Sequence, residues 1–269
     1  MYEMWYYSPD GKDYCLTGNK DLRYDNMFLM ENGIDGLVGE AEDSISNPAL
    51  FTGQRFYGLK TNAMTGELKV LIYPEDGTPI DKVYKEFRSS WSRSQYGTLT
   101  LVDTDSEGVL RLKVRLRNNM SAPTVHPGDN NGIELNIPVI SDGGVWNKEH
   151  ISAPEEKDKE KTRKITIHNY GDVFVRPKIV WDKNSSGEVI VPSGASFNLP
   201  AVDSRKTLYL DNSKSNIIVD EDNNVDRKLT MRLAQEVYSE GVPPAQSRDY
   251  IIPRDALMIW DIGLFDPWR

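Results

Sequence analysis

The residue types that support nucleophilic catalysis are few and scattered in this chain. Cys15 is the single cysteine, and the three histidines, His126, His150 and His168, stand far apart in the sequence. A nucleophile needs a base beside it, and no Gly-x-Ser-x-Gly motif accompanies these histidines. We therefore expect an inert Cys15 and a chain that is not an enzyme, although a pairing of Cys15 with a histidine in space stays open.

Metal sites also lack their usual spacing. The sequence has no His-x-x-x-His pair and no paired cysteines, so a zinc site is not expected. The acidic run 220–224 is similar to a calcium loop, but Val225 replaces the required glycine and Met231 the required glutamate. A hairpin turn between strands at 217–219 and 228–233 explains this run without a metal.

Cofactor motifs are equally absent. The sequence has no Gly-x-x-x-x-Gly-Lys-Ser/Thr loop, and the glycines Gly33, Gly36 and Gly39 do not follow the Gly-x-Gly-x-x-Gly spacing. We interpret these glycines as part of a flexible loop. Acidic residues number 41, so carboxylate pairs that could serve a glycosidase are unavoidable and carry no information. We expect no cofactor and no metal.

Binding to other proteins is the chemistry that the remaining patterns favour. Between residues 110 and 117, leucines and a valine alternate with four basic residues, Arg111, Lys113, Arg115 and Arg117. This period of two predicts a half-buried antiparallel strand with a fully basic outer face. The face is either simply solvated or meets acidic groups on a partner or a neighbouring copy, since like charges on one strand face repel.

Both ends of the sequence are rich in aromatic residues. Trp5, Tyr6 and Tyr7 lie near the N-terminus, and the last ten residues contain Trp260, Phe265 and Trp268. Such residues either tuck onto the core or anchor contacts with neighbouring subunits, because Trp and Tyr dominate interface anchors. Our candidate interface residues are Arg111, Lys113, Arg115, Arg117, Trp5, Trp260, Phe265 and Trp268.

The elements that would position these residues are mostly strands. One helix is predicted over 79–92, with Thr78 as its N-cap and Pro79 in its first turn. Strands are predicted at 66–73, 98–102, 110–116, 133–140, 164–167, 177–181, 187–191, 207–211, 217–219 and 228–233. Pro138 indicates an edge position for the fourth of them.

The predicted fold class is therefore mostly β with one α-helix. A run of charged residues at 155–161 divides the chain into an N-terminal β domain, 1–155, which holds the helix, and a C-terminal β-sandwich, 156–269. The net charge of −9 argues against nucleic acid as a main partner, because phosphate binding needs a basic surface. We find neither a secretory signal nor an apolar run that could cross a bilayer, and expect synthesis in a cytosol.

The order of these patterns resembles the distal tail protein of long-tailed (siphovirus) bacteriophages. The resemblance covers about residues 50 to 235 and rests on segments 53–58, 68–73, 79–92, 97–101, 108–116, 165–172, 176–179, 208–212 and 217–219. That family has an N-terminal ring-forming domain of strands around one helix, followed by a galectin-like β-sandwich.

The resemblance implies a structural protein of the virion, located at the tail tip and made in the host bacterial cytoplasm. Copies of the chain, six in the family, would form a ring around a channel for DNA passage, without sequence-specific DNA binding or membrane contact. The ring would join the tail tube and tape measure proteins to the tail-associated hub and receptor-binding apparatus. The alternative is a carbohydrate-binding sandwich or glycan-active enzyme, in which exposed Trp146 and Trp181 would stack on sugars.

Overall fold

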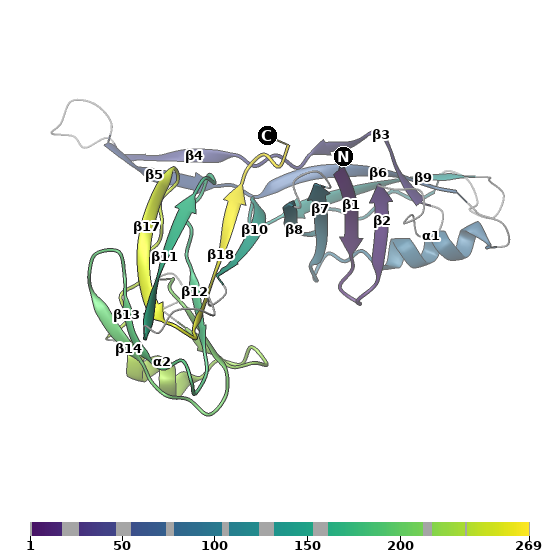
Figure 1. Ribbon diagram of the computed structural model, residues 1–269. Coiled ribbons are helices and arrows are strands. Elements are labelled where there is room, and N and C mark those ends of the chain that lie inside the picture. The colour runs from purple at the N-terminus through teal and green to yellow at the C-terminus, as the bar shows by residue number, and fades with distance from the viewer. Residues whose placement is uncertain are drawn as a thin grey trace. The chain divides into compact units, whose positions relative to one another are not determined.

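The computed structural model describes residues 2–17, 27–46, 55–73, 78–103, 108–123, 132–152, 161–211, 217–234 and 236–268. The chain divides into two compact units, with 1–147 and 264–269 in unit 1 and 148–263 in unit 2 (Figure 1). His126 and most of the charged run at 155–161 lie outside the described residues. The predicted division at residue 155 therefore stays a prediction.

Unit 1 is built from antiparallel strands and one helix. Its elements are β1 (Tyr2–Tyr7), β2 (Asp13–Thr17), β3 (Met27–Gly36), β4 (Ala41–Ser46), β5 (Arg55–Thr61), β6 (Met64–Ile72), α1 (Ile80–Ser89), β7 (Gly97–Asp103), β8 (Gly108–Leu116), β9 (Ile133–Ser141) and the start of β10 (Trp146–Ser152). Strands β8, β7, β1 and β2 are neighbours in that order, and β6 pairs with both β3 and β9. The predicted strands at 66–73, 98–102, 110–116 and 133–140 are thereby confirmed.

One face of the β8-β7-β1-β2 strands forms the core beneath α1. The pairing register aligns Tyr6 with Leu99, and Leu99 with Leu112, and all three side chains are buried. Helix α1 adds Phe87, whose ring meets Tyr14 of β2 edge-on at 4.9 Å between centroids. The period-two pattern of the strands and the 3.6-residue pattern of the helix thus supply one shared apolar layer.

The helix is confirmed, but its predicted ends are wrong. It spans Ile80–Ser89, and Pro79 occupies the N-cap position without a side-chain hydrogen bond, so Thr78 is not the cap. Trp91 lies beyond the helix and stacks on Tyr6 at 3.7 Å between ring centroids. The chain leaves the helix early because this aromatic stack, and not a further helical turn, buries the indole.

The glycines predicted to form a loop lie mainly in a strand, so that prediction is wrong. Gly33 and Gly36 belong to β3, which pairs with β6 around an irregularity between Leu29 and Ile34. A Cβ on Gly33 would lie 2.5 Å from a Met30 carbonyl oxygen, and Gly36 has a φ of +74°. The glycines permit a bulged strand to approach its neighbour closely.

Pro138 is also not at a sheet edge. Strand β9 pairs with β6 along its length and with β8 at its end, through Arg115 and Leu116. The Pro138 carbonyl accepts a hydrogen bond of 2.9 Å from the backbone N–H of Arg117. Proline lacks only the N–H donor, so its carbonyl still takes part in the sheet at the point where the β8 pairing stops.

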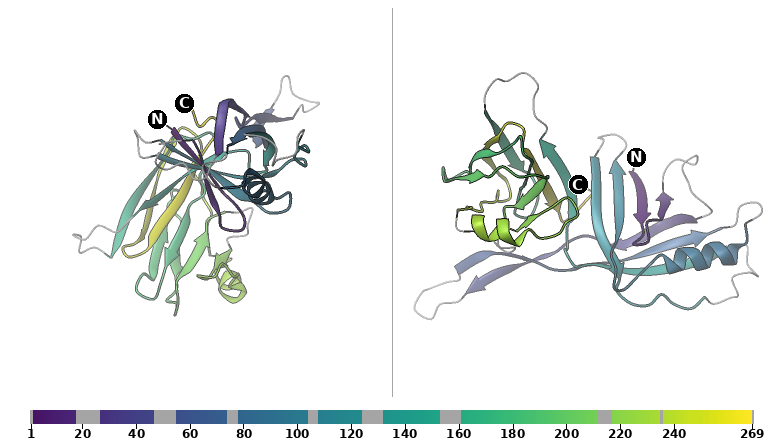
Figure 2. Two further views of the ribbon diagram at one scale, coloured as in Figure 1. Left: turned by 90° about the vertical axis from the view of Figure 1, so that its right-hand side faces the viewer. Right: turned by 90° about the horizontal axis from the view of Figure 1, so that it is seen from below.

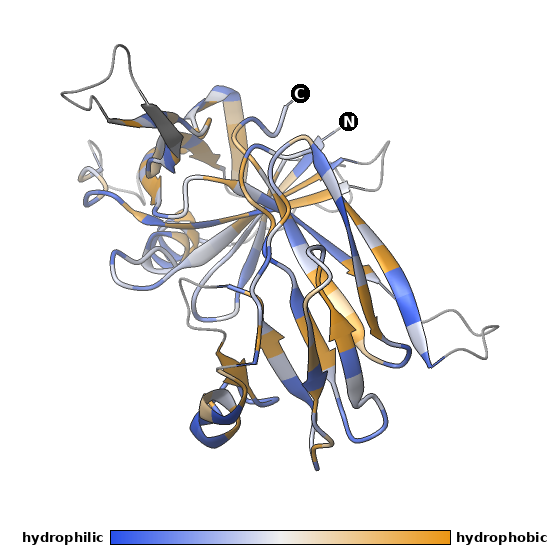
Figure 3. Cartoon of the chain, turned by 90° about the vertical axis from the view of Figure 1, so that its left-hand side faces the viewer, coloured by the Kyte–Doolittle hydropathy of each residue, from blue (hydrophilic) through white to orange (hydrophobic). Residues whose placement is uncertain are grey.

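Unit 2 is made of two sets of paired strands. Its elements are β11 (Thr162–Asn169), β12 (Lys178–Trp181), β13 (Gly187–Ile190), β14 (Ser196–Leu199), β15 (Lys206–Tyr209), β16 (Ile218–Val219), α2 (Arg227–Leu233), β17 (Gln246–Pro253) and β18 (Leu257–Leu264). One set runs β16-β15-β12-β18-β10 and the other β11-β17-β13-β14. Orange and blue bands alternate along these strands in Figure 3, as expected of sheets that bury one face. The mostly β fold class is confirmed.

A second helix replaces the strand predicted at 228–233. Asp226 caps helix α2 by accepting a hydrogen bond of 3.0 Å from the Leu229 N–H. Leu233 is buried, whereas Met231 is 77% exposed, so the apparent alternation does not mark one buried face. The acidic run before it does form a turn, in which the Asp220 carboxylate accepts from the Asn224 N–H at 2.8 Å. The local cap decides between helix and strand for this short segment.

Candidate assembly surfaces

The basic strand β8 does not present four equivalent charges. Arg111, Lys113 and Arg117 are exposed, whereas Arg115 is half-buried and forms a two-pronged ion pair with Asp142 at 2.7 and 2.8 Å. The Tyr96 hydroxyl donates to the same carboxylate at 2.5 Å. The prediction of a fully basic face is therefore wrong at Arg115, because the carboxylate of Asp142, the residue that follows β9, neutralises the charge of Arg115.

The ion pair makes a pH-dependent contribution to stability. Hydrogen bonds from Arg115 and Tyr96 hold the pKa of Asp142 below its usual value. A carboxyl group with a lowered pKa stabilises the fold above its unfolded pKa, and this stabilisation disappears as the pH falls through the folded value. Asp142→Asn should therefore lower the melting temperature at pH 7, and this difference should shrink below about pH 4 as the pH falls towards the lowered pKa of Asp142. An equal difference at both pH values would contradict the assignment, and Asp255→Asn on an exposed turn serves as a control.

The structure brings the N-terminal aromatics and the basic strand onto one face of unit 1. Trp5 is aligned with Thr100, and Thr100 with Arg111; Tyr7 is aligned with Thr98, and Thr98 with Lys113. A neighbouring row aligns Glu3 with Val102, and Val102 with Val109. We call the surface made by these three cross-strand rows the β1/β8 face. It comprises Glu3, Trp5, Tyr7, Thr98, Thr100, Val102, Val109, Arg111 and Lys113. It lies opposite the apolar face that carries Tyr6.

Exposure differs along this face. Thr100 is buried, Trp5 is half-buried, and Tyr7 is 44% exposed. The rings of Trp5 and Tyr7 are nearly parallel, at 6.4 Å between centroids. The β1/β8 face therefore offers stacked aromatic rings beside exposed cations. Sequence reasoning named both groups but did not place them together, because the β1–β7 pairing joins segments that lie far apart in the chain.

Two of the three C-terminal aromatic residues, Phe265 and Trp268, belong to unit 1. Phe265 accepts a backbone hydrogen bond of 2.8 Å from Gly39, and the Trp268 ring meets Tyr2 edge-on at 5.7 Å between centroids. Phe265 is half-buried and Trp268 is 38% exposed. These contacts tie the chain end to unit 1 and leave only Trp268 substantially accessible.

Trp260 lies in unit 2, where it takes part in a separate aromatic cluster. Its ring stacks on His150 at 5.5 Å, and the His150 Nε2 lies 3.1 Å from the Tyr170 hydroxyl. Burial and the neighbouring Lys148 lower the pKa of His150, which favours the neutral ring. The cluster thus joins β10, β18 and the residue after β11, and Trp260 is half-buried in it.

A further surface was missed by the sequence reasoning. Within the part of the chain that the structure describes, strands β4 and β5 pair only with each other, as a two-stranded ribbon. Figures 1 and 2 show this ribbon leading away from β1, β2, β7 and β8. Ile45 and Leu59 are 46% and 53% exposed on it. The short segment 41–46 mixes acidic, small and apolar residues without a regular alternation, so no periodic pattern marked it as a strand.

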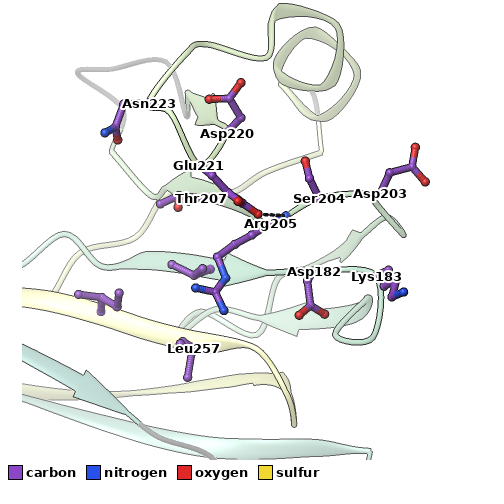
Figure 4. Close-up of a pocket in the computed structure, with 12 residues that line it drawn as sticks. Asp182, Lys183, Asp203, Ser204, Arg205, Thr207, Asp220, Glu221, Asn223 and Leu257 are labelled. Carbon is purple, nitrogen blue, oxygen red and sulfur yellow. Dashed lines mark hydrogen bonds between the residues drawn. The ribbon is translucent and has the colours of Figure 1, made fainter.

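Unit 2 carries an open pocket of about 750 Å³ (Figure 4). Its floor includes Val180, Leu257 and Ile259 from the sheet, and its wall holds Arg205, whose backbone N–H donates to the Glu221 carboxylate at 3.0 Å. Its lining contains charged, polar and aliphatic residues. Within the described ranges, no group of His, Cys, Asp and Glu side chains is placed to hold a metal ion.

The tryptophans expected to bind sugars are core residues, so that expectation is wrong. Trp146 and Trp181 are 0% and 1% exposed. Their indole N–H groups donate to the carbonyls of Leu37 and Pro200, both at 2.9 Å. Each large ring is buried and its polar edge is satisfied within the fold, which leaves no face for stacking on a saccharide. Cys15 is buried as well, with its Sγ 3.5 Å from the Thr17 carbonyl.

Comparison with known proteins identifies the fold. No family model and no curated protein matches the sequence. Among solved structures, the chain is similar to the Dit protein of phage SPP1, which is described as a paradigm of the hub adsorption apparatus in phages that infect Gram-positive bacteria. The two structures agree with a TM-score of 0.57 at 14% sequence identity, and the match covers 98% of this chain and 99% of that one. It is also similar to a chain of the phage P2 baseplate in its activated conformation with Ca, with a TM-score of 0.52, 10% identity and coverage of 97% and 98%. The resemblance to distal tail proteins is thus confirmed at the level of the fold. Among the described residues, no helix is long and apolar enough to span a membrane.

Proposed function

We propose that this chain is a non-enzymatic structural component of a phage tail tip, which assembles into a closed ring of the distal tail type. The observation that carries the proposal is the near-complete mutual coverage with SPP1 Dit, 98% of one chain and 99% of the other. An unrelated binding module that shared only a sandwich would match one unit and leave the other unmatched. Both units are matched here, so the proposal applies to the chain as a whole.

The ring would consist of six copies around a channel through which DNA passes. On one side it would meet the tail tube and tape measure proteins, and on the other the tail-associated hub protein. The net charge of −9 suits a conduit that must not retain a polyanion. A cyclic ring needs head-to-tail contacts between two different surfaces of the same chain. The protein would be made in the host cytoplasm and become part of the virion.

Mass measurement of the purified chain tests this function. We expect multi-angle light scattering to give about six times the monomer mass of 30.6 kDa, and negative-stain electron microscopy to show rings with an axial opening. Antibodies against the chain should label the tip of the phage tail. A strictly monomeric protein at high concentration, together with unlabelled tail tips, would refute the proposed function.

A further inference from the structure

The β4–β5 ribbon is exposed on a side that carries apolar groups and a carboxylate. Asp43 is aligned with Leu59 across the ribbon, and Ile45 lies two residues further along β4. The register shift between Ser44 and Ile45 skips a residue of β5 and leaves β4 continuous, so these three side chains share one side. We call this side the arm face. Asp43 is exposed, as are Ile45 and Leu59 at 46% and 53%.

A two-stranded ribbon with an exposed apolar side is only marginally stable in water by itself. Strand β4 has a single partner strand, and no third strand pairs with the ribbon among the described residues. Its exposed apolar side chains would be stabilised by a surface that removes them from water. The arm face therefore requires an apolar partner surface with cationic groups near the position of Asp43.

The β1/β8 face has the complementary chemistry. It offers the stacked rings of Trp5 and Tyr7, and the exposed cations Arg111 and Lys113 stand on its outer strand. Aromatic rings flanked by basic groups suit an aliphatic side with one carboxylate, because the rings bury the aliphatic groups and the cations face the charge.

We propose that the arm face of one copy docks on the β1/β8 face of the next copy. The inference rests on the proposed ring and names the two surfaces that would build it. The ribbon and the β1/β8 face occupy separate parts of unit 1 in Figures 1 and 2, so one copy offers both surfaces at once. Two different surfaces on one chain give a head-to-tail contact, which closes into a ring when the rotation between copies allows it.

Charge reversal on each surface tests the contact. Asp43→Arg alters the arm face, and the double variant Arg111→Glu/Lys113→Glu alters the β1/β8 face. We expect sedimentation velocity to show at least a tenfold weaker assembly for each, because like charges then oppose each other. The triple variant Asp43→Arg/Arg111→Glu/Lys113→Glu restores opposite charges and should recover most of the assembly. A triple variant that stays dissociated, with an unchanged melting temperature, would overturn this pairing of surfaces.

A mixing experiment gives a second readout. The Asp43→Arg chain keeps an intact β1/β8 face, and the Arg111→Glu/Lys113→Glu chain keeps an intact arm face. In an equimolar mixture every contact between unlike chains joins opposite charges, because the two native surfaces face each other at one contact and the two altered surfaces at the next. The mixture should therefore recover alternating rings that neither variant forms alone, and two surfaces that do not pair would give no recovery. A neutral variant, Ile45→Ser/Leu59→Ser, should also weaken assembly while the carboxylate of Asp43 remains.

Charge-matched controls lie in unit 2. Glu188→Arg on β13 and Lys228→Glu/Arg232→Glu on α2 change exposed residues of the same charges and should leave assembly unchanged. Rings formed equally well by wild type and all arm and face variants would refute the docking contact while the proposed function stands. A wild-type chain that forms no ring would refute the proposed function itself.

Discussion

Replacing Trp146 by alanine is expected to lower the free energy of unfolding by about 3 to 5 kcal/mol. The side chain is 0% exposed, so its removal leaves a cavity the size of an indole that the surrounding core fills only in part. The substitution also leaves the Leu37 carbonyl without the indole N–H that it accepts at 2.9 Å. Both losses act on unit 1, where the Trp146 side chain joins the start of β10 to Leu37 in the β3–β4 connection.

Urea unfolding of the monomer, followed by far-ultraviolet circular dichroism, measures this effect. Trp146→Phe separates the two losses, because it keeps much of the ring volume and removes only the donor; we expect it to cost less than half as much as alanine. Trp268→Ala is the matched control, since that ring is 38% exposed, and its effect should stay below about 1 kcal/mol. Equal effects of the two alanine substitutions would contradict a core role for Trp146.

The contrast between these tryptophans shows what the sequence could and could not reveal. Alternation over 108–116 identified β8 and the orientation of Leu112 and Arg111, because a half-buried strand imposes a period of two on its own sequence. No comparable local pattern surrounds Trp146 or Trp181. Their burial depends on strands that come from other parts of the chain, so an isolated aromatic residue gave no signal of its exposure.

Helix α2 illustrates a different limit. Its seven residues span less than two full helical turns, and a pattern of alternating apolar residues is then compatible with either a helix or a strand. The decisive contacts are the Asp226 cap and the Thr230 hydroxyl, which accepts a hydrogen bond of 3.1 Å from the Ile218 N–H. The second of these joins α2 to β16 and becomes visible only in the folded chain.

The candidate surfaces were predictable only in part for the same reason. Trp5 and the basic residues of β8 were named from their types, but they share a face because β7 lies between β1 and β8. The neutralisation of Arg115 depends on Asp142, which follows β9 in the chain. Residue type thus indicates what a side chain can bind, whereas strand pairing decides which side chains act together.

Asn169 is the polar residue of unit 2 whose replacement should have the largest effect. It is 2% exposed, and its amide donates to the carbonyls of Val173 and Val242, both at 2.8 Å. Its side-chain oxygen accepts from the Gly171 N–H at 2.9 Å. One side chain therefore fixes the turn after β11 and joins it to the segment at Val242.

Asn169→Leu preserves the volume of the side chain and removes all three hydrogen bonds. The Val242 carbonyl still accepts a hydrogen bond of 3.0 Å from the Val175 N–H. The substitution therefore affects the Gly171 N–H and the Val173 carbonyl most, because each loses its hydrogen bond to Asn169. Buried polar groups without partners cost about 1 to 3 kcal/mol each, and we expect a loss of about 2 to 4 kcal/mol in the free energy of unfolding. Urea unfolding measures the loss, with Asn198→Leu on the exposed side of β14 as control. An Asn169→Leu chain as stable as its control would mean that water or a shifted turn replaces these bonds, and that the turn after β11 is not held by this side chain.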